Sequence, residues 1–226
     1  IEGVVSVDFY GHPVGNTPMH PEERLSSRYS PERMAHVFIK DESQNPTRTV
    51  KARYAAAEIM RYAGMEEPVT FGGITAGNLG VAFGELGKIF SERTGFKRRF
   101  ASIVDRKMDK RIRKRLAEYG PVVDVELSKD YLTSSQILDI LTKNIDGSAG
   151  RIIPVGGVDY DGTSYRTIAR ELYSTGVRSN WHVYVPVGGG ETLASVIEGF
   201  EELEEMPHFV GATNEQNLFA STNGSG

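Results

Sequence analysis

Hydrophobic residues along the chain occur either in short uninterrupted runs or at intervals of three and four positions. Short apolar runs predict buried strands, and the longer amphipathic stretches predict helices. The expected strands are 36–39, 68–71, 100–104, 122–125, 151–155, 182–187 and 208–211. The expected helices are 52–62, 78–93, 106–119, 134–144, 164–174 and 191–204. Because strands alternate with helices, we expect βαβ units and an α/β fold with a mainly parallel sheet.

Composition narrows the class of protein. The chain has 226 residues, of which 39% are hydrophobic and 25% charged, as in ordinary globular proteins. Its net charge of -4 gives no reason to expect general attraction to nucleic acid or membranes. Because there is no cysteine, thiolate nucleophiles, disulfides and cysteine-based zinc sites are excluded. The histidines show no zinc-binding spacing, so we expect no metal.

Targeting signals are also missing from the sequence. No apolar run approaches the roughly 20 residues that span a bilayer. The chain begins with Ile1 rather than Met, and no signal peptide follows. We therefore expect a trimmed N-terminus and a cytoplasmic protein.

Three junctions between a strand and the next helix carry unusual residues, and ligands of parallel α/β proteins bind at such junctions. The first is a polar loop with an Asn-Pro turn that ends in Lys51, where the helix 52–62 begins. The positive end of a helix dipole disfavours a charged ammonium, which favours the neutral amine needed for Schiff-base chemistry. Taken alone, such a lysine is more often only a solvated residue.

The second junction reads Thr75-Ala76-Gly77-Asn78. Small residues before a helix let backbone N–H groups approach an anion, and Asn78 can donate a further hydrogen bond. The alternative is a turn in which Asn78 only caps the helix.

The third junction consists of Gly188, Gly189 and Gly190 after an apolar strand, followed by Thr192. Three glycines before a helix predict a phosphate cradle, to which Thr192 can add a hydroxyl. A dinucleotide fingerprint is incomplete here because Leu193 occupies its third glycine position.

One further segment is strongly basic. Between residues 97 and 115 there are ten Lys and Arg residues, against only Asp105 and Asp109. A solvated helix face is the simpler interpretation. The alternative is an electropositive surface for a phosphorylated substrate or a nucleic acid, although few aromatic residues are present to stack on bases.

In this order, the three junctions resemble the fold type II (tryptophan synthase β-like) family of pyridoxal-phosphate-dependent enzymes. That family has an Asn-Pro-Thr-x-Ser/Thr-x-Lys segment, a Ser/Thr-x-Gly-Asn loop and a later glycine loop. The closest similarity is to threonine synthases, through the segments 15–18, 40–42 and 199–203. The resemblance covers roughly residues 13 to 212.

The resemblance implies roles for individual residues. Lys51 would bind pyridoxal 5'-phosphate as a Schiff base and then act as general base at the substrate Cα. Asn78 would bind the ring's 3′ oxygen. The cofactor phosphate would lie on the glycine loop, and the substrate carboxylate on the second junction. The implied phosphate-binding residues are Gly188, Gly189, Gly190 and Thr192, and the implied carboxylate-binding residues are Thr75, Ala76 and Gly77.

The sequence departs from the family pattern at several positions. Arg48, Val50 and Ala52 replace the usual neighbours of the lysine, and Ala76 lacks a hydroxyl that often binds the substrate. The family also continues beyond the strand 208–211 with a segment that supplies a partner for the pyridine nitrogen. Residues 214–226 do not resemble it, so we expect a fragment, a short form or a partner chain that completes the fold.

These features predict a three-layer α/β/α enzyme with two domains. A large cofactor domain would comprise residues 1–51 and 149–226, and a smaller mobile domain residues 52–148. The expected protein is a homodimer, or is completed by a partner chain. It would be a carbon–oxygen lyase that converts the amino acid O-phosphohomoserine to threonine and phosphate. Alternatives are a threonine dehydratase, a cysteate synthase, an inactive homologue that serves as a binding domain, and a nucleotide-binding oxidoreductase.

Overall fold

The computed structural model describes residues 6–30, 32, 35–126, 132–146, 150–156 and 163–213. The chain forms two compact units. The first comprises Ile1–Val7, Pro13–Asn45 and Gly162–Gly226, and the second comprises Asp8–His12 and Pro46–Asp161. The domain boundaries expected at residues 51 and 149 stay a prediction. The tail from residue 214 onward, where the sequence departs from the family pattern, lies outside the described residues.

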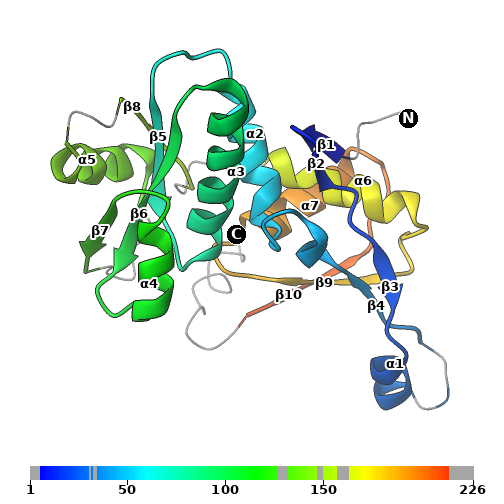
Figure 1. Ribbon diagram of the computed structural model, residues 1–226. Coiled ribbons are helices and arrows are strands. Elements are labelled where there is room, and N and C mark those ends of the chain that lie inside the picture. The colour runs from blue at the N-terminus through cyan, green and yellow to red at the C-terminus, as the bar shows by residue number, and fades with distance from the viewer. Residues whose placement is uncertain are drawn as a thin grey trace. The chain divides into compact units, whose positions relative to one another are not determined.

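The second unit is built on a parallel sheet with strand order β7-β6-β5-β8. Its strands are β5 (Val69–Ile74), β6 (Arg98–Asp105), β7 (Val122–Val125) and β8 (Arg151–Pro154). Its helices are α2 (Lys51–Arg61), α3 (Asn78–Thr94), α4 (Lys110–Ala117) and α5 (Ser134–Asn144). Figure 1 shows α2 and α3 on one side of this sheet and α5 on the other.

Alternation of side chains along the strands gives this sheet two apolar faces. On one face, the rings of Phe71 and Phe100 lie 5.2 and 5.1 Å from Phe83 of α3. On the other face, Ile103 belongs to a buried cluster with Leu141 of α5. Both faces are therefore covered, as parallel sheets require, and the expected three-layer α/β/α arrangement is confirmed.

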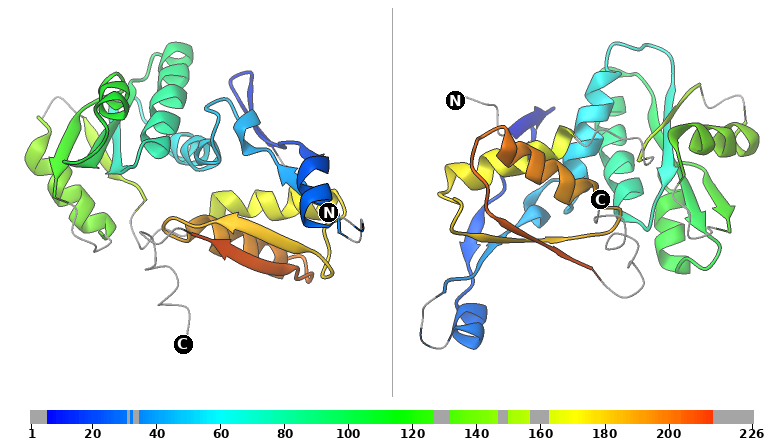
Figure 2. Two further views of the ribbon diagram at one scale, coloured as in Figure 1. Left: turned by 90° about the horizontal axis from the view of Figure 1, so that it is seen from below. Right: turned by 180° about the vertical axis from the view of Figure 1, so that it is seen from behind.

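The first unit contains a second βαβ element, visible in Figure 2. Strand β9 (His182–Pro186) leads through α7 (Glu191–Glu201) into β10 (His208–Ala212), which pairs with β9 in parallel. Helix α6 (Arg166–Ser174), preceded by the short helix η3 (Thr163–Tyr165), packs against α7. A Cβ at Gly199 would lie 2.7 Å from Ala169 Cβ, so the two helices approach closely at this glycine.

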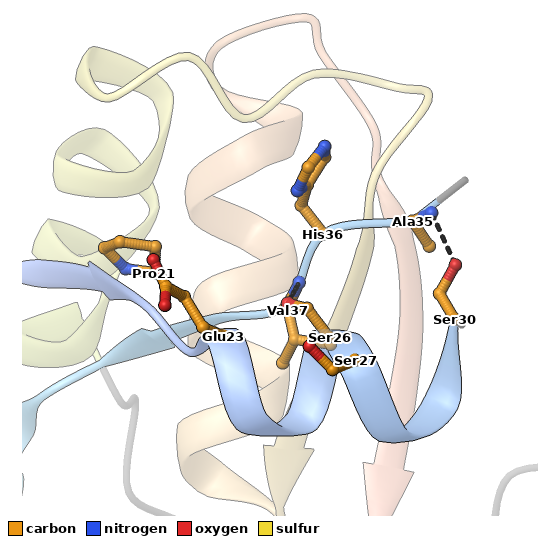
Figure 3. A pocket seen from close by; sticks show the side chains of 8 residues that line it. All are labelled: Pro21, Glu23, Ser26, Ser27, Ser30, Ala35, His36 and Val37. Carbon is orange, nitrogen blue, oxygen red and sulfur yellow. Dashed lines mark hydrogen bonds between the residues drawn. The ribbon is translucent and has the colours of Figure 1, made fainter. Parts of the chain in front are cut away.

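The N-terminal elements are short. Strands β1 (Ser6–Phe9) and β2 (His12–Gly15) pair with each other, and β3 (Met19–Pro21) pairs antiparallel with β4 (Phe38–Lys40). Helix α1 (Glu23–Tyr29) lies between β3 and β4 in the sequence. A cavity of about 300 Å³ lies between α1 and the segment 35–37 (Figure 3). None of the helices in the described ranges could cross a bilayer, because each is too short or too polar.

From residue 51 to residue 212 the elements expected from the sequence are present, with shifted ends. Helix α4 begins at Lys110 rather than 106, because the carboxylate of Asp109 accepts a hydrogen bond of 2.7 Å from the Arg111 backbone and caps the helix there. Helix α7 ends at Glu201 rather than 204. The sequence analysis missed β1, β2, β3 and α1, because their apolar runs are too short to show a period.

Candidate active site

Lys51 is the first residue of α2, as the sequence predicted. A 3-10 turn, η1 (Glu42–Gln44), precedes the Asn-Pro segment. Lys51 is half-buried, and its backbone N–H donates to Thr49 Oγ1 at 3.3 Å. The N-cap residue Val50 offers no side-chain hydrogen bond to the helix. Lys51 therefore stands at the positive end of the dipole of a helix that has no side-chain cap and no acidic residue in its first turn.

The segment before Lys51 is held in an unusual conformation. Arg48 has a φ of 57°, in the left-handed region that residues other than glycine rarely adopt. Thr47 is buried, and its hydroxyl has no hydrogen-bond partner among the described residues. Strain and an unsatisfied polar atom cluster at functional sites more than elsewhere in proteins. Both features lie within four residues of Lys51.

The second junction, Thr75 to Asn78, follows β5 directly and opens α3. Thr75 is 5% exposed, and its Oγ1 accepts hydrogen bonds from Gly77 N at 2.9 Å and Gly80 N at 3.2 Å. Gly77 is the N-cap with a φ of 135°, a conformation available in practice only to glycine. Asn78 is the first helical residue and is exposed, so the alternative that it caps the helix is wrong.

These contacts separate two roles within the second junction. The hydroxyl oxygen of Thr75 is used for capping, although its O–H can still donate a hydrogen bond. Ala76 and Asn78 are exposed on the outer side of the turn. An incoming group would therefore meet the backbone at Ala76 and the amide of Asn78 first.

The glycine loop, Gly188 to Gly190, joins β9 to α7 in the first unit. Gly190 is the N-cap of α7 with a φ of 96°, and no side chain caps this helix. A Cβ at Gly188 or Gly190 would meet no atom within 4 Å, so the loop has open space around it. Thr192 is half-buried in the first turn. This is the geometry of an anion cradle at a helix N-terminus.

Glu191, which the sequence analysis did not single out, lies at this cradle. It is the first residue of α7, and a Cβ at Gly189 would be 2.6 Å from Glu191 Oε1 and 3.1 Å from Oε2. The carboxylate therefore leans over the glycine loop, where the helix dipole stabilises a negative charge. A phosphate bound to the same loop has to share or displace this carboxylate.

A buried polar network in the first unit was also missed as a functional feature. Lys40 Nζ lies 2.5 Å from Glu171 Oε2 and also donates to the backbone oxygen and the hydroxyl of Thr17. Glu171 accepts the backbone N–H groups of Asn16 at 2.8 Å and Thr17 at 3.2 Å. This network ties the segments 15–18 and 40–42, noted in the sequence only for their resemblance, to helix α6.

The same network reaches the loop that precedes Lys51. Thr17 Oγ1 donates to Glu42 Oε1 at 2.7 Å, and Asn45 Nδ2 donates to Glu42 Oε2 at 2.9 Å. Asn45 Oδ1 accepts from Gly15 N at 2.9 Å. Hydrogen bonds from Ser43 and Gln44 lower the pKa of Asp41 in the adjacent turn. The polar groups of residues 41–45 thus satisfy one another and fix the conformation of this first part of the loop, in contrast to the hydroxyl of Thr47.

The predicted site residues therefore fall into two groups. Lys51 and the junction Thr75 to Asn78 belong to the second unit, and the glycine loop with Thr192 belongs to the first. One group offers an amine and an amide beside helix N-termini, and the other offers a cradle for an anion.

Comparison with known proteins identifies the family. Residues 11–224 match the family model described as pyridoxal-phosphate dependent enzyme. No curated protein matches the chain significantly. Solved structures do match, at sequence identities that show the fold alone.

One similar structure is an O-ureido-L-serine synthase, with a TM-score of 0.67 and 19% identity over 92% of this chain. A second is a fungal L-serine ammonia-lyase from Rhizomucor miehei, with a TM-score of 0.68 and 17% identity over 96% of this chain. A third is an O-acetylserine dependent cystathionine beta-synthase from Helicobacter pylori, with a TM-score of 0.63 and 19% identity over 88% of this chain. The chain spans 63% of the length of each of these structures. The match over nearly the whole chain and the α/β fold place it in one family: it belongs to the pyridoxal-phosphate-dependent enzymes of fold type II.

Proposed function

We propose that this chain carries pyridoxal phosphate on Lys51 and acts on a small amino acid. The observation that carries the proposal is the position of Lys51, half-buried as the first residue of α2 with no capping carboxylate on that helix. When bound, the cofactor supplies the electron sink for a carbanion at the substrate Cα.

The described residues suit this cofactor. The open space at Gly188 and Gly190 leaves the N-terminus of α7 accessible to a phosphate group. The unpartnered hydroxyl of Thr47 is a polar group that a ligand near Lys51 can satisfy. Glu191 is a poor match, because its carboxylate repels a phosphate at the same loop.

Each group has a role in the proposal. Lys51 would hold the cofactor through its amine, and the free amine would move the proton at the substrate Cα. Asn78 would donate a hydrogen bond from its side-chain amide to the cofactor ring's oxygen. The O–H of Thr75 and the N–H of Ala76 would orient the substrate carboxylate, because the N–H groups of Thr75 and Gly77 already donate to Ile103 O and Thr75 Oγ1. The glycine loop and Thr192 hold the phosphate, which fixes the cofactor by its far end.

For the substrate we propose O-phosphohomoserine, which with water gives threonine and phosphate. This choice is supported by the similarity of the segments 15–18, 40–42 and 199–203 to threonine synthases. The second candidate is β-elimination or β-replacement on a serine derivative, favoured by the names of the similar solved structures. In either case a domain division near residues 51 and 149 would allow closure over the substrate.

The cofactor assignment is tested by mixing the purified chain with pyridoxal phosphate. We expect a yellow absorbance, and after borohydride reduction a mass increase on the peptide that contains Lys51. Lys51→Ala should lose both signals, while Lys88→Ala, at a side chain that is 72% exposed on α3, should keep them. A wild-type chain that stays colourless and unmodified contradicts the assignment.

The substrate assignment is tested with the cofactor-loaded chain. O-phosphohomoserine should give threonine and phosphate in equal amounts, and L-serine or L-threonine should give little ammonia and 2-oxo acid. Release of 2-oxo acid instead supports the second candidate. Cofactor binding without any turnover supports a binding domain that has kept the fold.

A further inference from the structure

The segment that joins β6 to α4, together with the first residue of α4, carries a cluster of three cations. Arg106, Lys107 and Lys110 are exposed and form no ion pair with the described residues. The two acidic residues of this segment are already engaged. Asp105 Oδ1 accepts from Lys107 N at 2.7 Å, and Asp109 caps α4 and pairs with Arg111 at 3.2 Å.

Neighbouring carboxylates offset the charge of this cluster only in part. Asp124 pairs with Arg113 and also interacts electrostatically with Arg106, and Glu85 pairs with Arg115 at 2.8 Å. The hydrogen bond from Arg111 lowers the pKa of Asp109, which therefore stays ionised in that pair. Arg106, Lys107 and Lys110 thus remain as a local excess of positive charge in a chain whose net charge is -4.

Helix stability does not explain these cations. Lys114 and Arg115 in the last turn of α4 complement the negative end of the helix dipole. Lys110 stands in the first turn and Arg106 and Lys107 stand just before it, where the dipole opposes positive charge. A solvated helix face accounts for the cations of the last turn and leaves the other three unexplained.

The cluster lies beside the junction Thr75 to Asn78. Strands β5 and β6 run parallel with Ile74 opposite Ile103, and Thr75 N donates to Ile103 O at 3.0 Å. The loops that follow the two strands therefore emerge side by side at the carboxyl edge of the sheet (Figure 1). A Cβ at Gly77 would lie 3.2 Å from Cγ2 of Ile112, so α4 touches the junction itself.

We propose that Arg106, Lys107 and Lys110 form a subsite for a second anionic group, a phosphate ester on the side chain of the amino-acid substrate. This inference rests on the proposed function, in which the neighbouring junction binds the substrate carboxylate. A phosphate dianion binds to clustered Lys and Arg by charge-assisted hydrogen bonds, more strongly than a neutral hydroxyl does. The subsite selects phosphorylated amino acids over their unphosphorylated forms.

The test measures binding, so that it does not depend on turnover. The cofactor-loaded chain is titrated with O-phospho-L-homoserine and with L-homoserine, and the spectrum of the bound cofactor reports the Kd of each. The variant replaces all three cations, as Arg106→Gln, Lys107→Gln and Lys110→Gln. The matched control carries Lys88→Gln, Arg93→Gln and Lys97→Gln. It removes the same number of positive charges, but near the end of α3 and the start of β6, away from the junction.

The triple variant should bind O-phospho-L-homoserine at least about tenfold more weakly, the size expected for losing hydrogen bonds to a charged group. Its Kd for L-homoserine should stay within about twofold of the wild-type value. Its thermal unfolding midpoint should stay within a few degrees of the wild type. The control should leave both Kd values unchanged. Equal losses in the triple variant and the control indicate general charge attraction and overturn the subsite.

Two further outcomes separate this inference from the proposed function. If the wild type takes up no cofactor, the proposed function fails, and calorimetry of O-phospho-L-serine on the cofactor-free chain decides the subsite. Weaker binding by the triple variant then supports it, and unchanged binding overturns it. If the triple variant loses binding to a single-stranded RNA but binds the phospho-amino acid as the wild type does, the cations serve a nucleic acid. That result also overturns the subsite.

Discussion

Two glycine-containing junctions of this chain differ in what satisfies the helix that follows. At the start of α3, the buried hydroxyl of Thr75 accepts from two backbone N–H groups, and the turn is closed from inside. At the start of α7 no side chain caps the helix, and the space around Gly188 and Gly190 is open. One junction is complete by itself, whereas the other presents unsatisfied donors that suit an external anion.

The difference between the two junctions lies in one residue type at one position. Thr75, two residues before the N-cap Gly77, reaches the first turn of α3, whereas Gly188, two residues before the N-cap Gly190, has no side chain. The presence of glycines alone therefore does not tell an anion cradle from a self-capped turn. The residue two positions before the N-cap has to be considered as well.

Backbone strain should separate the two junctions most strongly. Gly77→Ala forces a φ of 135° on a residue with a Cβ, placed 3.2 Å from Ile112. We expect a loss of about 3 kcal/mol in the free energy of unfolding, at the upper end for such conformations. Gly190→Ala, in the left-handed region with nothing near its Cβ, should lose only about 1 kcal/mol. Urea denaturation measures both, and equal losses would contradict the comparison.

The capping hydroxyl gives a second test. Thr75→Val keeps the side-chain volume but leaves Gly77 N and Gly80 N without their acceptor, so we expect about 1–2 kcal/mol of destabilisation. Thr75→Ser should recover most of it. The control Thr192→Val should leave the stability within about 0.5 kcal/mol, because Thr192 caps nothing. A Thr75→Val chain as stable as the wild type would show that the turn closes without the hydroxyl.

The smallest effect concerns the open junction. Glu191→Gln removes a negative charge that leans over Gly189, so the Kd for pyridoxal phosphate should fall by about twofold to fivefold, as for a surface-exposed charge pair. Glu201→Gln, at the other end of α7, is the control and should leave the Kd unchanged. The change should shrink in high salt, because exposed charges are screened. Weaker cofactor binding by Glu191→Gln would show that the carboxylate assists the loop instead.

Most of the fold followed from residue pattern between residues 51 and 212. The buried strands β5 and β6 and the long helix α3 have strong apolar periods, and their positions were predicted within a few residues. Helix α4 was predicted four residues too early, because basic residues continue through the loop while Asp109 starts the helix. The N-terminal elements lack a period, and among them the segments 15–18 and 40–42 are held by the network around Lys40 and Glu171.

The sequence by itself determined the α/β class, the three junctions and the position of Lys51 at the start of a helix, because periodicity and turn residues are local properties. Only the tertiary structure decided that Thr75 closes its own turn, that Glu191 leans over the glycine loop and that three cations lie beside the junction at Gly77. The first two are contacts within a few residues, made by side-chain conformations that a sequence pattern does not specify, and the third depends on the parallel pairing of β5 with β6. Pairing and register join residues far apart in the sequence, which no local pattern encodes.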